Sequence, residues 1–333
     1  MLVPFVIDAD SLAPDPAWTA AQVHTCHQSL LEVWRRVGLL THDGDSFENS
    51  RLKAAVQQLP QKLRTLWQEM LERAPLRACG SGWDGTLKAD NISQLIGITS
   101  LALVDDGRAE VDFELAEDEL SRPVEFAQGM EVCRLASAVQ AKTFQKALDQ
   151  SGIHIELGET FDNIWALRFR SLATAHIKRV AIVDRYAVSR HFFHPQAQLS
   201  GLERFLRLLD QDADGARYVS LFSAWTPELG EEKLADVKAD LAKVMARLPS
   251  KKVQRLKISM VPNPAFRVRG HDRFFRFGDY VWDIGLGLQV FQGAYSPARS
   301  SAAFKTGDDI VRGYKKVEED LAGDRRTKVV EVP

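Results

Sequence analysis

The sequence predicts an α/β protein of two domains, and three observations support this fold class. The chain has 333 residues, enough for two domains that each bury a hydrophobic core. Short apolar runs, typical of buried strands, occur at residues 2–7, 98–104, 179–184, 218–222 and 257–261. Segments with the helical spacing of apolar residues lie between most of these runs. This alternation favours mixed or mostly parallel sheets covered by helices on both faces, and we place the two domains at residues 1–150 and 155–325.

The composition is that of a soluble globular protein, with 45% hydrophobic and 26% charged residues. The net charge is −2, so binding to nucleic acid would require a local basic surface. Three widely spaced cysteines (Cys26, Cys79 and Cys133) predict buried thiols in a reducing compartment. No apolar run is long enough to cross a bilayer, and the first residues lack the basic segment of a signal peptide. We therefore expect a cytoplasmic protein with no membrane partner.

The first domain opens with the predicted strand at residues 2–7, which is followed by Asp8 and Asp10. Amphipathic spacing predicts helices at residues 17–37, at 52–76 with a break near Pro60, and at 132–151. Residues 41–49 and 79–85 are predicted turns or loops, and the acidic stretch 112–125 a solvated loop. Asp105 and Asp106 follow the second strand. Because open α/β sheets place their sites at the carboxyl ends of strands, these acids are candidate site residues.

Residues 6–12 (VIDADSL) resemble the first strand of PIN-like nuclease domains. The resemblance implies an α/β fold in which several carboxylates hold Mg²⁺ or Mn²⁺, and the metal activates water for phosphodiester hydrolysis. Asp8, Asp10 and Asp105 would then be metal ligands. The alternative is that acids at strand ends only cap the helices that follow.

The second domain begins with a helix for which Thr160 is the predicted N-cap. The strand at residues 179–184 is short and apolar, as expected of a central strand. Further helices are predicted at residues 202–209, 231–248 and 308–321. Residues 262–264 are a predicted turn, and residues 267–288 are predicted to form a hairpin.

This hairpin carries the residues that point most directly to a function. Strand-like alternation from residue 267 onward places Arg269, His271 and Arg273 on one face. Planar guanidinium groups match phosphate oxygens, and an imidazole can move protons near neutral pH. Glycines in the strand that follows allow backbone to approach a ligand closely. We therefore predict a phosphate site here, with Arg269, Arg276 and Lys305 as phosphate-binding residues.

Residues 180–186 (VAIVDRY), the triplet 271–273 (HDR) and residues 282–291 (WDIGLGLQVF) resemble a phospholipase-D-like domain. The type is the one found at the C-terminus of MIT-domain proteins, and the resemblance covers residues 158–321. Related bacterial domains accompany phage-defence systems. The resemblance implies phosphodiester hydrolysis without a metal, with His271 as nucleophile and the His271 of a second copy as general acid. Arg273 would hold the non-bridging oxygens, and Asp279 is the catalytic residue nearest to the position of the motif's aspartate. One such motif in each chain implies a homodimer that joins two copies of His271.

The sequence departs from the family motif in two places. Arg273 stands where the motif has lysine, and Asp279 lies one residue beyond the expected position. A second partial match, His176 with Lys178 and Asp184, lies where the family has no catalytic histidine, so we interpret it as chance.

Three interpretations of the hairpin follow. The hairpin is part of a nuclease that needs no cofactor at this site. Mg²⁺ or Mn²⁺ would be required only if the first domain has an active site of its own. It binds nucleic acid or another phosphate without turnover, as a subunit of a defence complex with partner proteins. Or its arginines only pair with Asp272, Asp279 and Asp283. His191 and His194, three residues apart in a predicted loop, are expected to be surface residues and not metal ligands.

Overall fold

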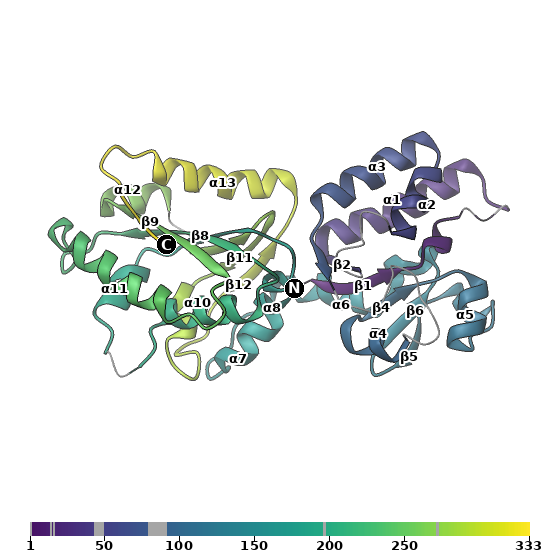
Figure 1. Ribbon diagram of the computed structural model, residues 1–333, viewed down its shortest axis with the longest axis horizontal. Helices are drawn as coiled ribbons and strands as arrows, with labels where there is room; N and C mark the ends of the chain where they lie inside the picture. Colours follow the sequence, from purple (N-terminus) through teal and green to yellow (C-terminus); the bar gives the residue numbers. More distant parts are fainter. Residues whose placement is uncertain are drawn as a thin grey trace. The chain divides into compact units, whose positions relative to one another are not determined.

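The computed structural model describes residues 2–13, 15, 17–42, 50–78, 92–195, 198–270 and 273–333. The chain divides into two compact units, Met1–Gln150 and Ser151–Pro333, which we call the N-terminal unit and the C-terminal unit. Each unit contains one sheet flanked by helices (Figure 1). The predicted α/β class is therefore confirmed. No helix in the described part of the chain is long and apolar enough to cross a membrane.

The N-terminal unit contains a six-stranded sheet with the order β3-β2-β1-β4-β6-β5. Neighbouring strands are parallel, except that β5 and β6 are antiparallel. The strands are β1 (Val3–Ile7), β2 (Gly38–His42), β3 (Leu76–Ala78), β4 (Leu101–Leu103), β5 (Val124–Ala127) and β6 (Met130–Cys133). The helices are α1 (Ala20–Val37), α2 (Arg51–Gln58), α3 (Gln61–Arg73), α4 (Ile92–Ile98), α5 (Asp106–Phe113) and α6 (Lys142–Asp149). Short 3-10 turns are η1 (Ala9–Leu12), η4 (Glu119–Ser121) and η5 (Leu135–Gln140).

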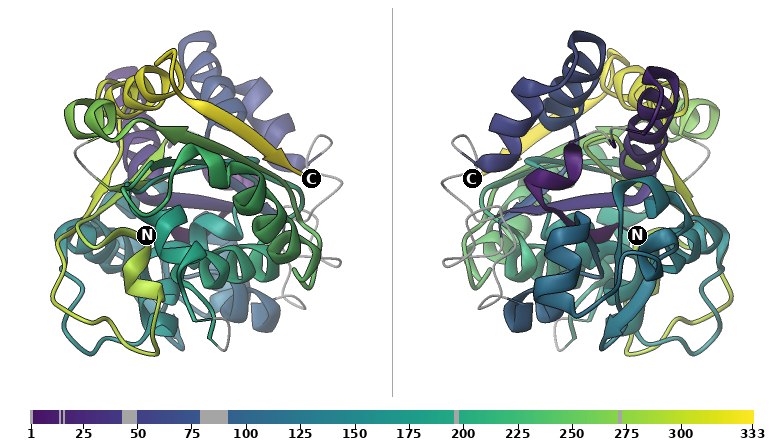
Figure 2. Two further views of the ribbon diagram at one scale, coloured as in Figure 1. Left: turned by 90° about the vertical axis from the view of Figure 1, so that its left-hand side faces the viewer. Right: turned by 90° about the vertical axis from the view of Figure 1, so that its right-hand side faces the viewer.

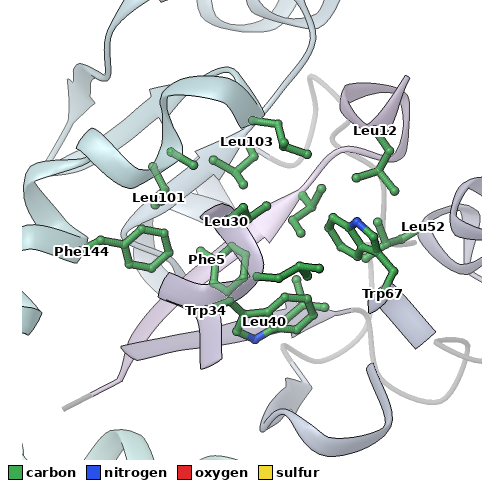
Figure 3. Packing of buried hydrophobic residues seen from close by; sticks show 14 of the residues in the cluster. Phe5, Leu12, Leu30, Trp34, Leu40, Leu52, Trp67, Leu101, Leu103 and Phe144 are labelled. Carbon is green, nitrogen blue, oxygen red and sulfur yellow. The ribbon is translucent and has the colours of Figure 1, made fainter. Parts of the chain in front are cut away.

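Strand β1 lies inside this sheet, and its side chains alternate between two hydrophobic cores. Phe5 packs edge-on against Trp34 of α1 and Phe144 of α6, with ring centroids 5.4 and 5.6 Å apart (Figure 3). Val6 belongs to the core on the other face, which includes Phe113 of α5. Because both faces are covered, the strand is apolar along its whole length.

The helix predicted from residue 17 begins at residue 20, and the break predicted near Pro60 is confirmed. Helix α1 begins after Thr19, whose hydroxyl accepts the Gln22 N–H at 3.3 Å while the Gln22 side chain accepts the Thr19 N–H at 2.9 Å. The predicted break at Pro60 separates α2 from α3. The sequence therefore marks both boundaries through ordinary capping and proline chemistry.

Three other predictions for this unit are wrong. Thr41 lies in β2 and not in a turn, because a strand follows α1 without a loop. The helix predicted at 132–151 is divided into β6, η5 and α6, since a short apolar run fits a buried strand as well as a helix. The stretch 112–125 is not a plain solvated loop, because it buries Leu120 and leads into β5. Residues 43–49 and 79–85, predicted as turn and loop, lie outside the described residues.

The C-terminal unit contains a seven-stranded mixed sheet with the order β12-β11-β10-β7-β8-β9-β13. Strands β7, β8 and β9 are parallel, and the remaining pairs are antiparallel. The strands are β7 (Arg179–Val183), β8 (Arg217–Ala224), β9 (Val253–Val261), β10 (Phe274–Phe277), β11 (Tyr280–Ile284), β12 (Ala302–Lys305) and β13 (Lys328–Val332). Strand β7 occupies the centre, as its apolar sequence predicted.

Helices cover both faces of this sheet (Figures 1 and 2). They are α7 (Phe161–Ile164), α8 (Arg170–Ala173), α9 (Ala187–Phe192), α10 (Gly201–Asp212), α11 (Leu234–Ala246), α12 (Asn263–Arg269) and α13 (Asp308–Ala322). A π-helical segment, η7 (Trp165–Phe169), joins α7 to α8, and 3-10 turns are η8 (Glu231–Lys233) and η9 (Gly287–Phe291). Helices α12 and α13, the latter yellow in the figures, lie on one face, and α7, α8, α10 and α11 lie on the other. The predicted N-cap of α7 is confirmed, because the Thr160 hydroxyl accepts the Asn163 N–H at 3.2 Å.

The predicted hairpin is correct for residues 274–284 and wrong for residues 267–269 and 285–288. Strands β10 and β11 pair as expected, but residues 263–269 form helix α12. Pro264 suits the first helical turn because its missing N–H would have no partner there. Phe266 is buried while Val268 is 83% exposed. Arg269 therefore belongs to a helix and does not share a strand face with Arg273.

Candidate phosphate-binding site

The candidate site lies at the carboxyl end of β7, the central strand of the C-terminal unit. Asp184 follows this strand directly, and α9, which carries Arg190, begins three residues later. Strand β10 runs antiparallel to β7, with Phe274 paired to Val183. Arg273, just before β10, therefore reaches the same edge of the sheet. Open α/β sheets bind their ligands at such strand ends.

Asp184 is buried and contacts three segments of the chain at this end of the strands. Its Oδ1 accepts the Tyr186 N–H at 3.0 Å, and its Oδ2 accepts the Leu288 N–H at 2.8 Å. The same Oδ1 lies 3.8 Å from Nε of Arg273. Gly287 has a φ of +56°, and a Cβ at this position would lie 2.2 Å from Asp184 Oδ2. The turn after β11 therefore approaches the carboxylate so closely that a side chain would not fit.

Three arginines surround the ring of Tyr186, and we call Arg185, Arg190 and Arg273 the arginine cluster. Their guanidinium carbons lie 5.2, 5.2 and 5.5 Å from the ring centroid, within the range of cation–π contacts. The cluster gathers three positive charges at one aromatic ring, next to the carboxylate of Asp184. Such a group of partly buried cations favours the binding of an anion, because the anion reduces their mutual repulsion.

The three guanidinium groups differ in their hydrogen bonds. Arg185 Nε donates to Asn263 Oδ1 at 2.9 Å, and Arg273 Nη1 donates to the carbonyl of Gly285 at 2.6 Å. Nη1 of Arg190 is buried and has no hydrogen-bond partner among the described residues. Burial lowers the pKa of Arg190, Asp184 opposes this effect, and Arg273 adds to it. Leaving a buried donor unsatisfied costs about 1–3 kcal/mol, so a bound oxyanion would stabilise this group.

Of the catalytic residues predicted from the sequence, Arg273 belongs to the arginine cluster and Asp279 does not. Asp279 lies in the turn between β10 and β11, at the other end of β10 from Arg273. Its carboxylate pairs with Lys315 at 2.7 Å. The structure therefore does not bring Asp279 and Arg273 together, which corrects the predicted site. His271 lies outside the described residues.

The residues predicted to bind phosphate are not members of the arginine cluster. Arg276 is engaged by Glu318 through two hydrogen bonds of 2.6 Å, from Nε and from Nη2. Arg269, in α12, donates to a backbone carbonyl of α13 at 3.0 Å. Lys305 ends β12 and is paired with Val281 near the start of β11. It therefore lies at the opposite ends of the strands from the arginine cluster. Arg276 and Arg269 already have partners of their own.

The acids predicted as metal ligands in the N-terminal unit are engaged by arginines or by backbone. Asp8 Oδ2 accepts from Arg108 Nε at 3.0 Å, and Asp10 pairs with Arg51 at 2.8 Å. Asp105 caps α5 by accepting the Arg108 N–H at 2.8 Å, as the alternative prediction stated. Burial raises the pKa of Asp8 in spite of Arg108. Within the described residues, no three His, Cys, Asp or Glu side chains form a group that could hold a metal ion.

Sequence reasoning missed three residues of the candidate site, Arg185, Tyr186 and Arg190. The signal that could have identified the first two was their position directly after the predicted central strand. Arg190 follows one helical turn later, so its place beside Tyr186 depends on α9 beginning at residue 187. Asp184 was interpreted as a chance match, although it is the residue that holds this strand end together.

Comparison with known proteins gives a weak structural similarity and no family match. No protein-family model and no curated protein matches the chain. Among solved structures, it is similar to phosphatidylserine synthase from Haemophilus influenzae Rd KW20, with 11% sequence identity and a TM-score of 0.32. The match covers 62% of this chain and 51% of that protein, so the chain spans about half of its length. A similarity at this TM-score carries no argument about activity, and the candidate site is therefore defined by its own geometry.

Proposed function

We propose that the C-terminal unit binds a phosphodiester at the arginine cluster and acts as a nucleic-acid phosphodiesterase. The observation that carries this proposal is Arg190, whose buried Nη1 has no partner among the described residues although two further arginines lie at the same ring. Guanidinium groups donate to phosphate oxygens in a geometry that matches the anion. The carboxyl end of a central strand is also where sheets of this class bind ligands.

In this proposal Arg190 and Arg273 hold the non-bridging oxygens, and Asp184 orients Arg273 from its buried position. His271 precedes Arg273 by two residues in the sequence. Its imidazole attacks phosphorus and the P–O bond to the leaving nucleotide breaks, while a general acid protonates the departing oxygen; water then hydrolyses the phosphohistidine. The general acid is a second His271, supplied by another copy of the chain in a homodimer. The chemistry assigned to the protein side chains requires no metal at this site.

The test is cleavage of single- and double-stranded DNA and RNA by the purified full-length chain with EDTA present. We expect cleavage that the His271→Ala variant abolishes and that Arg299→Ala, which changes an exposed arginine, leaves intact. Cleavage that requires Mg²⁺ or Mn²⁺ and disappears in Asp8→Ala would instead place the active site in the N-terminal unit. Cleavage that survives His271→Ala and also needs no metal would contradict both mechanisms.

A second candidate function is phosphate binding without turnover, as in a subunit of a phage-defence complex. The position of Asp279 favours it, because the acid that the resemblance assigned to catalysis pairs with Lys315 away from the cluster. This function predicts salt-sensitive binding to nucleic acid that Arg190→Met weakens, in a protein that does not cleave. Co-purification with the product of a neighbouring gene would identify the partner.

A further inference from the structure

A second group of chemically matched side chains lines a cavity of about 420 Å³ in the C-terminal unit. The cavity lies among α9, the start of α10 and α11, and its lining includes His191, Ser200 and Asp240. His191 was expected to be a surface residue, but its side chain is only 7% exposed. The arginine cluster contributes no residue to this lining, so the two sites are separate.

The three side chains form a continuous chain of contacts. Ser200 is the N-cap of α10, and its Oγ accepts the Glu203 N–H at 3.1 Å. The same Oγ lies 2.6 Å from Nδ1 of His191. Nε2 of His191 lies 3.2 Å from Oδ2 of Asp240, although it is not aligned for a hydrogen bond. Asp240 is 33% exposed, so a small rotation of its side chain can align the pair.

These contacts allow proton transfer from Ser200 to His191. Because Ser200 Oγ already accepts the backbone N–H of Glu203, its own hydrogen can be donated to Nδ1 of His191. The imidazole then carries its hydrogen on Nε2, which faces the carboxylate of Asp240. Hydroxyl, imidazole and carboxylate thus stand in the order required of a nucleophile, a base and the acid that orients the base. The imidazole here presents Nδ1 to the serine, and either ring nitrogen can accept the proton.

We propose that Ser200, His191 and Asp240 form a second catalytic site, which hydrolyses small carboxylic esters. Burial lowers the pKa of His191, so the ring is neutral and able to act as a base at physiological pH. The first turn of α10 supplies backbone N–H groups beside Ser200, where the negative charge of the reaction intermediate develops.

The reaction balances within these groups and water. Ser200 Oγ attacks the carbonyl carbon while its proton passes to Nδ1 of His191. The imidazolium returns that proton to the departing alcohol, which leaves an acyl ester on Ser200. Water then attacks this ester as His191 takes its proton, the carboxylic acid departs, and the proton returns to Ser200. Asp240 stabilises the imidazolium in both steps.

The walls of the cavity indicate the class of substrate. A volume of about 420 Å³ suits a small molecule and excludes a folded polymer. Charged side chains of both signs line the cavity, because Lys243 and Arg247 lie there together with Glu203, Asp236 and Asp240. The polar wall therefore suits a short-chain ester with polar groups and does not select one sign of charge.

The test is covalent labelling of the full-length protein with a fluorophosphonate, followed by mass mapping of the modified peptide. In the protein without substitutions we expect one adduct, on Ser200. The labelling rate should fall as the pH is lowered, because His191 becomes protonated. Asp240→Asn should slow labelling by about a hundredfold or more. Asp236→Asn is the matched control, because Asp236 lines the same cavity one helical turn earlier and should leave the rate unchanged.

Two results would overturn the proposal. One is the absence of an adduct on Ser200 under conditions that fully label a known serine esterase. The other is equal labelling of Asp240→Asn and the parent protein, with both shown to be folded by circular dichroism. Hydrolysis of a p-nitrophenyl ester by the parent protein and its loss in Asp240→Asn would add direct support. Neither readout depends on the arginine cluster, so the outcome is independent of the proposed phosphodiesterase.

Discussion

Arg190 and Arg273 approach the ring of Tyr186 with their guanidinium carbons 5.2 and 5.5 Å from its centroid. The two side chains come from segments more than eighty residues apart, and burial together with the charge of Arg273 lowers the pKa of Arg190. Proteins rarely gather like charges at partly buried positions without a ligand or partner that compensates the cost. The arrangement that would bind an anion therefore lowers the stability of the folded protein when no anion is bound.

Arg190→Met should therefore weaken phosphate binding without destabilising the protein. We expect the dissociation constant for inorganic phosphate, or for a short oligonucleotide, to rise at least about tenfold. The free energy of unfolding should stay unchanged or rise by about 1 kcal/mol, because a poorly paired buried cation is removed. Calorimetric titration and urea unfolding measure the two effects. Arg299→Met, at an exposed position, should change neither, and a large loss of stability in Arg190→Met would mean that the side chain is structural.

Removal of two aspartates of the C-terminal unit should lower stability by very different amounts. Asp184→Ala leaves the N–H groups of Tyr186 and Leu288 without their acceptor, so we expect a loss of about 2–4 kcal/mol. Asp279→Ala removes an exposed ion pair with Lys315 and should cost less than about 1 kcal/mol. Urea denaturation of both variants provides the comparison. Nuclease activity that survives in Asp279→Ala would agree with the distance of this residue from the cluster.

The N-terminal unit should lose stability in acid because of His27. This residue is buried and accepts the Nε1–H of Trp67 on Nδ1 at 3.0 Å. Burial lowers its pKa from 6.5 to about 4, so between these values the unfolded chain binds more protons than the folded one. Stability therefore falls as the pH is lowered from 6.5 toward 4, by at most about 3 kcal/mol from this group. His27→Gln keeps an acceptor for Trp67, and its unfolding free energy should depend less on pH in that window. An identical pH dependence would refute the assignment.

Arg108 should be essential for the stability of the N-terminal unit at neutral pH. Its guanidinium group contacts Asp8 and Asp112, both with buried carboxylates, at 3.0 and 2.6 Å. Arg108→Met leaves these charges unpaired, and we expect a loss of about 3–5 kcal/mol. The pKa of Asp8 is already raised by burial, so the folded variant takes up a proton before the unfolded chain does. The defect relative to the parent protein should therefore shrink as the pH is lowered. A pH-independent defect would point to lost packing instead.

The sequence predicted those elements whose signal is local. Strand β7 is a short apolar run, α7 begins at a capping Thr160, and α2 ends before Pro60. Helix α12 was missed because its last three residues, Arg267, Val268 and Arg269, alternate between charged and apolar side chains, which fits a strand as well as a short helix. What decides between them is the burial of Phe266 in the core beneath α13, which is a tertiary effect.

The candidate site was predictable only in part for a related reason. Arg273 was identified from its own motif. Arg276 has the same side chain and lies nearby in the sequence, but its guanidinium group is paired with Glu318, 42 residues away. Arg190 carries no motif at all. Its importance arises from a missing partner, and a missing partner is a property of the folded environment and not of neighbouring residues in the sequence.

The contact between Asp184 and the Leu288 N–H also has a consequence for how the protein is made. These residues are 104 positions apart in the chain. At ordinary translation rates the ribosome needs roughly 5–20 seconds to add that segment. Until then the carboxylate on the nascent chain is held by water and by the Tyr186 N–H, and Arg273 does not yet exist for much of that time. A chain interrupted after β9 could carry its three parallel strands and Arg190, yet the site would still lack the turn that fixes its carboxylate.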